Sequence, residues 1–254
     1  MNFLSIKTRG MGENYKVGWV WRLKMRYPIS FLAIQETQLM EAGNIDVRSC
    51  WGDDEFGVSR VNASGRPRGL LNMWDRNVFT SNEVISSRHY IINIGTWVGI
   101  SEPLIFANIY GPQLITGKAE LWKELIEIKN TKNGIWIMMG DYNAVRHRGE
   151  RFNSNFCERT TRDFNNFIHK IRLSDLKMGG HRFTCFHNSD LKLSKLDRFM
   201  VYPTFLNLFP YISVTALPRE ISDHCPILLS TSRYGTPDLY LTAKIKHIKN
   251  GLKK

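Results

Sequence analysis

Residues 135–143 read IWIMMGDYN, an apolar run that stops at polar side chains. Five consecutive apolar residues, Ile135–Met139, predict a strand, and the Gly140-Asp141 pair predicts its end. Asn143 follows two residues later. Because the ends of strands are where a sheet presents side chains to a cleft, this stretch predicts a polar site at the edge of a sheet.

Four further places along the chain likewise have a polar residue directly next to an apolar run. They are Glu36 after FLAIQ, Tyr110 after LIFANI, Asp197 before RFMV, and Asp223 with His224 before CPILL. Each polar residue thus lies at one end of a predicted strand. The repetition makes these residues candidates for one shared cleft.

Hydrophobic periodicity predicts the remaining elements. A stretch rich in Gly, Asn, Ser and Arg, Asp53–Arg68, predicts a loop. Many short strands with helices between them favour a two-sheet sandwich with helices on its outer faces. The predicted helices are Lys16–Tyr27, Lys118–Asn130 and Thr161–Ile171, and the other predicted strands are Phe3–Thr8, Phe31–Ile34, Leu70–Trp74, Tyr90–Trp97, Leu104–Tyr110, Phe183–His187, Leu196–Val201, Ser213–Leu217 and Pro226–Leu229.

Length and composition describe an ordinary globular chain. Its 254 residues suffice for one sizeable domain, and no apolar run reaches the length of a membrane span. The N-terminal residues lack the apolar core of a signal peptide. The cysteines lie far apart, with no CxxC or Cys/His cluster, which favours buried reduced thiols and an intracellular location. These cysteines are Cys50, Cys157, Cys185 and Cys225.

The chain is strongly basic, with a formal net charge of +12. Five lysines follow residue 240, but the rest of the chain is basic as well. A basic body attracts a polyanionic partner such as nucleic acid. A solvated basic surface without a partner explains the same charge.

The polar residues at the strand ends suit phosphodiester hydrolysis. A hard cation such as Mg²⁺ prefers oxygen ligands, which Glu36, Asp141 and Asp223 could supply. Pairing with Asp197 would orient the ring of His224 and favour its protonated form. Asn143 could align water or phosphate, and Tyr110 could donate to a phosphate oxygen.

Each of these residues also has a structural interpretation. A Gly-Asp pair before a loop is often only a turn, and Ser-Asp-His can cap a helix or turn. A lone histidine is more often structural than catalytic, and Tyr110, before Gly111-Pro112, could be a turn aromatic. Their number and order, rather than any single residue, favour a catalytic site.

The ordered motifs resemble the endonuclease/exonuclease/phosphatase superfamily, and within it the apurinic-endonuclease-like domain of plant LINE-type retrotransposons. The resemblance covers about residues 1–230. It implies a four-layer α/β/β/α sandwich of two mixed sheets flanked by helices, the DNase I-like fold, and Mg²⁺- or Mn²⁺-dependent nicking of DNA that leaves a 3′-hydroxyl. The motifs are QET, NIYGP, MGDYNAVR, KLDRFMV and SDHCPILL, with WDRNVF, LWKEL, RDFNNFI and HRFTCF in the same order.

The resemblance also implies roles for individual residues. Glu36 would bind the metal, supported by Asp223. Asp141 would be the base or water-positioning acid with Asn143 beside it, Tyr110 would contact the scissile phosphate, and His224, oriented by Asp197, would stabilise charge or act as acid or base. The basic residues expected to contact substrate are Lys7, Arg9, Arg66 and Arg68.

One departure from the family concerns the metal site. The family's first strand normally reads SWNxRG, but here it reads SIKTRG, so Lys7 stands where an asparagine is expected. A protonated lysine cannot ligate Mg²⁺, and at about 4 Å it would repel the ion by roughly 8 kcal/mol at an effective dielectric near 20. We hypothesise that Lys7 weakens metal binding and activity; alternatively, it simply pairs with Glu36 in a metal-poor site.

Two further departures lie in RPRG, where the family tends to have paired glycines, and in the basic end of the chain. Residues 231–254 are expected to be a tail left from a linker toward a reverse transcriptase, with a basic amphipathic helix over Leu241–Leu252. The leading hypothesis is a nuclear DNA endonuclease with no membrane and no obligate protein partner. Its alternatives are a phosphatase of the same superfamily and a non-catalytic nucleic-acid-binding remnant.

Overall fold

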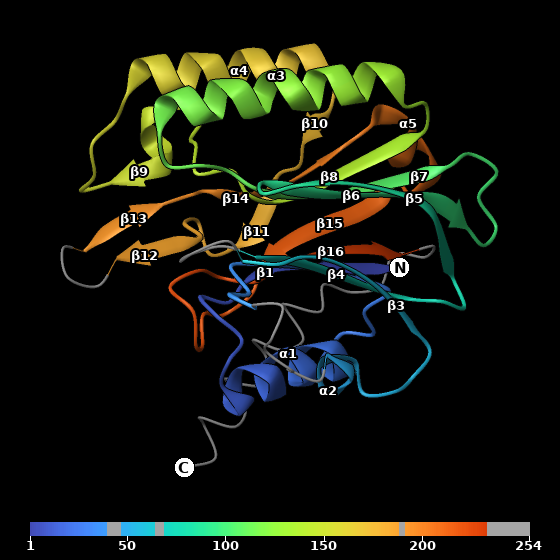
Figure 1. Cartoon of the computed structure of the whole chain (residues 1–254). Coiled ribbons are helices and arrows are strands. Elements are labelled where there is room, and N and C mark those ends of the chain that lie inside the picture. The colour runs from blue at the N-terminus through green and yellow to red at the C-terminus, as the bar shows by residue number, and fades with distance from the viewer. Residues whose placement is uncertain (40–46, 64–68, 188–190, 233–254) are drawn as a thin grey trace.

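The computed structural model describes residues 1–39, 47–63, 69–187 and 191–232. Within them, two β-sheets lie face to face, and helices cover the outer face of each sheet (Figure 1). This is the predicted four-layer α/β/β/α sandwich. Arg66, Arg68 and the predicted helix over Leu241–Leu252 lie outside the described residues.

The first sheet has seven strands among the described residues, in the order β11-β15-β16-β1-β2-β4-β3. Its central strands β1 and β2 run parallel, and their neighbours pair antiparallel to them. Strand β1 is buried along most of its length because it lies inside the sheet with helices below it. The bounds are β1 Asn2–Lys7, β2 Phe31–Gln35, β3 Phe56–Val61, β4 Leu70–Asp75, β11 Met178–Gly180, β15 Tyr211–Ala216 and β16 Ile227–Ser232.

The second sheet has six strands among the described residues, in the order β10-β14-β8-β7-β6-β5. Strands β7 and β8 run parallel, while β14 pairs antiparallel with β8. A small sheet, β12-β13-β9, extends beside it. The bounds are β5 Phe79–Ser87, β6 Tyr90–Trp97, β7 Leu104–Tyr110, β8 Ile135–Asp141, β9 Arg151–Phe152, β10 Ser174–Asp175, β12 Cys185–His187, β13 Lys192–Ser194 and β14 Asp197–Val201.

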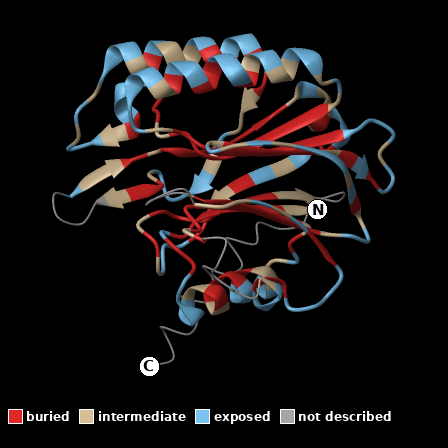
Figure 2. Cartoon of the chain, in the orientation of Figure 1, coloured by how far each residue is buried: buried red, intermediate tan, exposed pale blue. Residues whose placement is uncertain are grey.

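Three apolar layers hold the sandwich together. An aromatic-rich layer, including Phe31 stacked on Phe106 with ring centroids 4.1 Å apart, fills the space between the sheets. A second layer packs α1 and α2 against the first sheet, and a third packs α3 and α4 against the second (Figure 2). The helix bounds are α1 Asn14–Arg26, α2 Arg48–Trp51, α3 Ile115–Thr131, α4 Glu158–Ile171 and α5 Pro203–Leu208, with a 3₁₀ turn at Arg148–Glu150.

A chain of buried amides crosses between the two sheets. Gln35 Nε2 of β2 donates to Asn108 Oδ1 of β7 at 2.7 Å, and Asn108 Nδ2 donates to Asn72 Oδ1 of β4 at 2.8 Å. Asn72 Nδ2 then donates to Asn93 Oδ1 of β6, also at 2.8 Å. Each step passes from one sheet to the other, so the amides form a ladder through the otherwise apolar interior.

The structure corrects several details predicted from sequence. The predicted loop Asp53–Arg68 is wrong at Phe56–Val61, where β3 forms the edge of the first sheet. Edge strands carry exposed polar residues on one side, so their sequence is similar to that of a loop. The edge strand β5 was likewise not predicted. Cys157 is exposed rather than buried.

Among the described residues, no helix is long and apolar enough to cross a membrane.

Candidate functional site

The topology brings the predicted polar residues together at one end of the sandwich. Strand β1 ends at Lys7, paired in register with Gln35, the residue before Glu36. Strands β7 and β8 end together, with Tyr110 opposite Asp141, and β14 begins at Asp197, also opposite Asp141. Strand ends from both sheets therefore meet here, which is why residues far apart in sequence share one site.

Lys7 lies at the centre of this cluster. Its Nζ is 2.9 Å from Asp141 Oδ2, 3.3 Å from Glu36 Oε1 and 3.4 Å from His224 Nε2. It also lies 5.3 Å from the centre of the Tyr110 ring. Only 9% of the lysine side chain is exposed, so its ammonium is held inside the cluster rather than in solvent.

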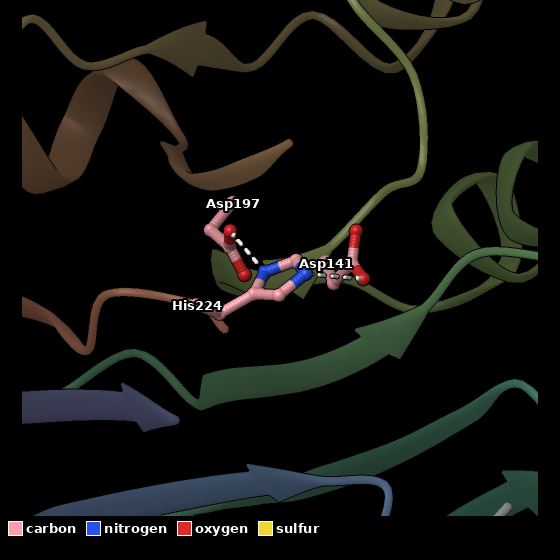
Figure 3. Close-up of side chains that lie close together, drawn as sticks. All are labelled: Asp141, Asp197 and His224. Carbon is pink, nitrogen blue, oxygen red and sulfur yellow. Dashed lines mark hydrogen bonds and ion pairs between the residues drawn. The ribbon is translucent and has the colours of Figure 1, made fainter. Parts of the chain in front are cut away.

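His224 is held in line between two aspartates (Figure 3). Its Nδ1 lies 2.7 Å from Asp197 Oδ2, and its Nε2 lies 3.9 Å from Asp141 Oδ2. All three side chains are buried. Asp197 thereby fixes the orientation of the imidazole, and Nε2 is the ring nitrogen that faces the Lys7–Asp141 pair.

Tyr110 and Asn143 are each held by hydrogen bonds within the cluster. The Tyr110 hydroxyl donates to the Glu36 carboxylate. Asn143 donates twice: its backbone N–H reaches Asp141 Oδ1 at 2.8 Å, and its side-chain Nδ2 reaches the Gly111 carbonyl at 2.7 Å. Asn143 therefore fixes the Asp141 carboxylate, while its own amide is fixed by the neighbouring turn.

Asp223 and Arg9 lie together at the rim. Arg9 Nη1 is 3.5 Å from Asp223 Oδ2, and the Arg9 side chain is 61% exposed. Asp223 was expected to support the metal, but its carboxylate pairs with this arginine instead. Arg9 is therefore accessible to a ligand beside the cluster.

The cluster's charges shift its proton affinities. Burial alone would lower the pKa of Lys7, but Asp141, Glu36 and Tyr110 outweigh it and raise that pKa. Burial would raise the pKa of Asp141, but Lys7 and His224 hold it below its usual range. The pKa of His224 is raised because Asp197 and Asp141 outweigh the opposing effect of burial. Burial and Glu36 raise the pKa of Tyr110 against the effect of Lys7.

Three residues of the site have left-handed backbone conformations, among them Arg9 with a φ angle of +52°. The φ angle is +53° at Glu36 and +49° at Asn143. Residues other than glycine rarely adopt this region, and such strain concentrates at functional sites. These conformations occur where the chain turns after a strand: Glu36 directly follows β2, and Asn143 lies two residues after the end of β8.

Three residues that support the cluster through hydrogen bonds were not predicted from the sequence. Thr184 Oγ1 accepts the backbone N–H of Asp197 at 3.1 Å, and Ser222 Oγ accepts that of His224 at 3.1 Å. Asn108 lies two residues before Tyr110, completely buried in the amide ladder. Its signal was available, because it is a polar residue inside the apolar run LIFANIY.

The fit of a divalent metal depends on where it would bind. Ligand atoms of Asp141, Asp197 and His224 lie within 4.8 Å of one another. The Lys7 ammonium occupies this grouping as well, because its Nζ lies 2.9 Å from Asp141 Oδ2 and 3.4 Å from His224 Nε2. Glu36, the expected ligand, instead accepts from Tyr110 and pairs with Lys7. Because Lys7 stands between Glu36 and Asp141, the residues present do not fit a divalent cation bound between these two carboxylates.

No family model and no curated protein matches the chain. Solved structures match over nearly its whole length. The 3′-5′ exonuclease NExo from Neisseria meningitidis has a TM-score of 0.70 at 16% identity, covering 91% of this chain and 100% of that one. An AP endonuclease from Archaeoglobus fulgidus has a TM-score of 0.70 at 14% identity, covering 91% and 99%.

A third similar structure contains nucleic acid. The 3′ phosphatase NExo from Neisseria, bound to a product DNA hairpin, has a TM-score of 0.66 at 17% identity, covering 91% of this chain and 99% of that one. At such identities the similarity shows the fold. The chain therefore has the two-sheet, helix-flanked fold of AP endonucleases and of a 3′-5′ exonuclease.

Proposed function

We propose that this chain hydrolyses phosphodiester bonds in DNA, with Asp141 and His224 as the reacting side chains. One observation carries the proposal: the buried line Asp197–His224–Asp141 lies where strand ends of both sheets converge. A carboxylate that orients a histidine toward a second carboxylate is an arrangement suited to proton transfer. The fold shared with AP endonucleases supports the same chemistry.

In the proposed reaction, water attacks phosphorus and the bond to the 3′ oxygen breaks. Asp141 aligns the water and accepts its proton, and protonated His224 donates a proton to the departing oxygen. Lys7 and His224 face the negative charge that develops on the phosphate. Because Lys7 holds the pKa of Asp141 low, Asp141 is a weak base, and we expect the reaction to be slow.

DNA is the proposed substrate because the chain is basic and Arg9 is exposed at the rim of the site. The origin in a LINE-type retrotransposon is a further part of the proposal, and the motifs from QET to SDHCPILL support it. Such an origin predicts a nick that carries a 3′-hydroxyl. A DNA polymerase should therefore extend the nicked product directly.

A second candidate function is DNA binding without cleavage. The specific observation in its favour is the Lys7 ammonium, which lies between the two carboxylates that a catalytic metal would need. The two candidates differ in one outcome, because a binder retains DNA in a salt-dependent manner but leaves the strands intact.

The deciding experiment is nicking of supercoiled plasmid, with EDTA, Mg²⁺ or Mn²⁺ in separate reactions. We expect slow conversion to the open circle, and a His224→Ala variant should lower the rate by about 10²- to 10⁴-fold. His169→Ala removes an exposed histidine of α4 and is the matched control. Intact plasmid under all three conditions, with DNA binding retained, would replace the hydrolase by the binder.

A further inference from the structure

We infer that the ammonium of Lys7 takes the place of a divalent cation in this site, so that Glu36 and Asp141 bind neither Mg²⁺ nor Mn²⁺. The positive charge between these carboxylates is then a permanent part of the chain. Its use toward a DNA phosphate rests on the proposed function. The exclusion of metal does not, because it follows from the contacts of Lys7 alone.

The N–H donors of Lys7 face the carboxylate oxygens of the site. A lysine ammonium has three N–H donors and no acceptor. Two carboxylate oxygens lie close to Nζ, one of Asp141 at 2.9 Å and one of Glu36 at 3.3 Å. Nε2 of His224, at 3.4 Å, is not an acceptor when the imidazole is protonated. The carboxylates thus already share a cation that fits them.

Lys7 is held in position by its strand and by its burial. Lys7 is the last residue of β1, a strand that pairs with a neighbour on each side within the sheet. The side chain is 9% exposed, and the Tyr110 ring lies 5.3 Å from Nζ. If the lysine turned away, it would leave the Glu36 and Asp141 carboxylates buried without their counter-charge.

A divalent metal has coordination requirements that this site does not meet. Mg²⁺ needs oxygen ligands at about 2.0–2.1 Å in a nearly octahedral arrangement. An ion between Glu36 and Asp141 would contact the ammonium, which cannot serve as a ligand. Replacing the lysine by asparagine would instead provide an amide oxygen at the same position, with both carboxylates left free.

The test is Mn²⁺ binding, measured by the electron paramagnetic resonance signal of the free ion. The full chain should show no saturable binding to the site, whereas Lys7→Asn should bind Mn²⁺ at least about tenfold more tightly. Adding Glu36→Gln to Lys7→Asn should remove the gain. Lys132→Asn, which breaks a salt bridge with Glu83, is the matched control and should behave as the unchanged chain.

A measurement on the unchanged chain tests the inference even if Lys7→Asn fails to fold. Bound Mn²⁺ broadens the NMR signals of nearby nuclei, so the imidazole resonances of His224 should stay sharp as Mn²⁺ is added. Broadening of His224 at low Mn²⁺, or equal Mn²⁺ affinity of the unchanged chain and Lys7→Asn, would overturn the inference. A folded Lys7→Asn that gains no Mn²⁺ affinity would overturn it as well.

These outcomes are separate from those of the nicking assay. Nicking that requires Mg²⁺ would contradict the inference but support the hydrolase. Failure to nick under any condition, together with sharp His224 signals, would contradict the hydrolase but support the inference. Nicking in EDTA would support both.

Discussion

Replacing Lys7 by methionine should strongly destabilise the fold, because it removes the shared cation but keeps most of the side-chain volume. At an effective dielectric near 20, the attraction at 2.9 Å to Asp141 is about 6 kcal/mol, and that at 3.3 Å to Glu36 is about 5 kcal/mol. The substitution also removes the cost of burying the ammonium, which offsets several kcal/mol of this sum. We expect a net loss of about 3–5 kcal/mol in the free energy of unfolding, as when one partner of a buried ion pair is removed.

Urea denaturation at pH 7, followed by circular dichroism, measures this loss. Lys132→Met is the control, because Lys132 pairs with Glu83 where both side chains are partly exposed, and its loss should stay below about 1 kcal/mol. Equal small losses for both variants would refute the assigned role of Lys7.

The pH dependence provides a second check on the same variant. A depressed pKa means that Asp141 contributes stability above its unfolded pKa, and that this contribution disappears as the pH falls through its folded pKa. Without Lys7 the pKa of Asp141 should rise. The difference between the unchanged chain and Lys7→Met should therefore shrink as the solution becomes acidic. A difference that stays constant from pH 7 to pH 3 would contradict the coupling of these two groups.

Three further predictions concern separate features. The raised pKa of His224 means that its pairing with Asp197 stabilises the fold fully below about pH 6.5, and less as the pH rises through the folded pKa. Asp197→Asn should therefore lower the free energy of unfolding by about 3 kcal/mol in urea melts near pH 5.5, and by less in alkali. Arg9→Ala should reduce the slope of log affinity for DNA against log salt by about 1, as measured by fluorescence anisotropy, and an unchanged slope would exclude phosphate contact. Gly57→Ala should lower the stability by about 1–3 kcal/mol in thermal melts, because a Cβ there would lie 2.1 Å from a tryptophan ring of β4. Gly12→Ala is the control and should be neutral, because a Cβ at Gly12 meets nothing within 4 Å.

Much of the sandwich could be predicted because its central strands are apolar runs of sufficient length. The run Ile135–Met139 lies within β8, and β7 matches the predicted Leu104–Tyr110. The edge strands β3 and β5 escaped prediction because exposed positions along them carry polar residues. Their pairing depends on a neighbour in space rather than on their own periodicity.

The candidate site was predictable as a set of residues, whereas its arrangement was not. Polar residues at the ends of apolar strands were visible in the sequence, including Asp197 and His224. The sequence could not decide whether Lys7 turns away or fills the cluster, because that depends on the parallel pairing of β1 with β2 and on the facing strand β8. The contact of Arg9 with Asp223 is likewise set by the fold rather than by sequence spacing.

The amide ladder between the sheets has a consequence for how precisely the site is built. Two apolar sheet faces can shift relative to each other with little change in energy. Hydrogen-bonded amides pair in one relative position of the sheets only, because any shift leaves buried donors unpaired. Gln35 adjoins Glu36, and Asn108 lies two residues before Tyr110, so this ladder sets the relative position of the two sheets next to the candidate site. The ladder thereby fixes the position of Glu36, which follows a strand of the first sheet, relative to Tyr110 in the second sheet. Substituting apolar residues for the ladder would leave a well-packed protein whose two halves no longer share a single alignment.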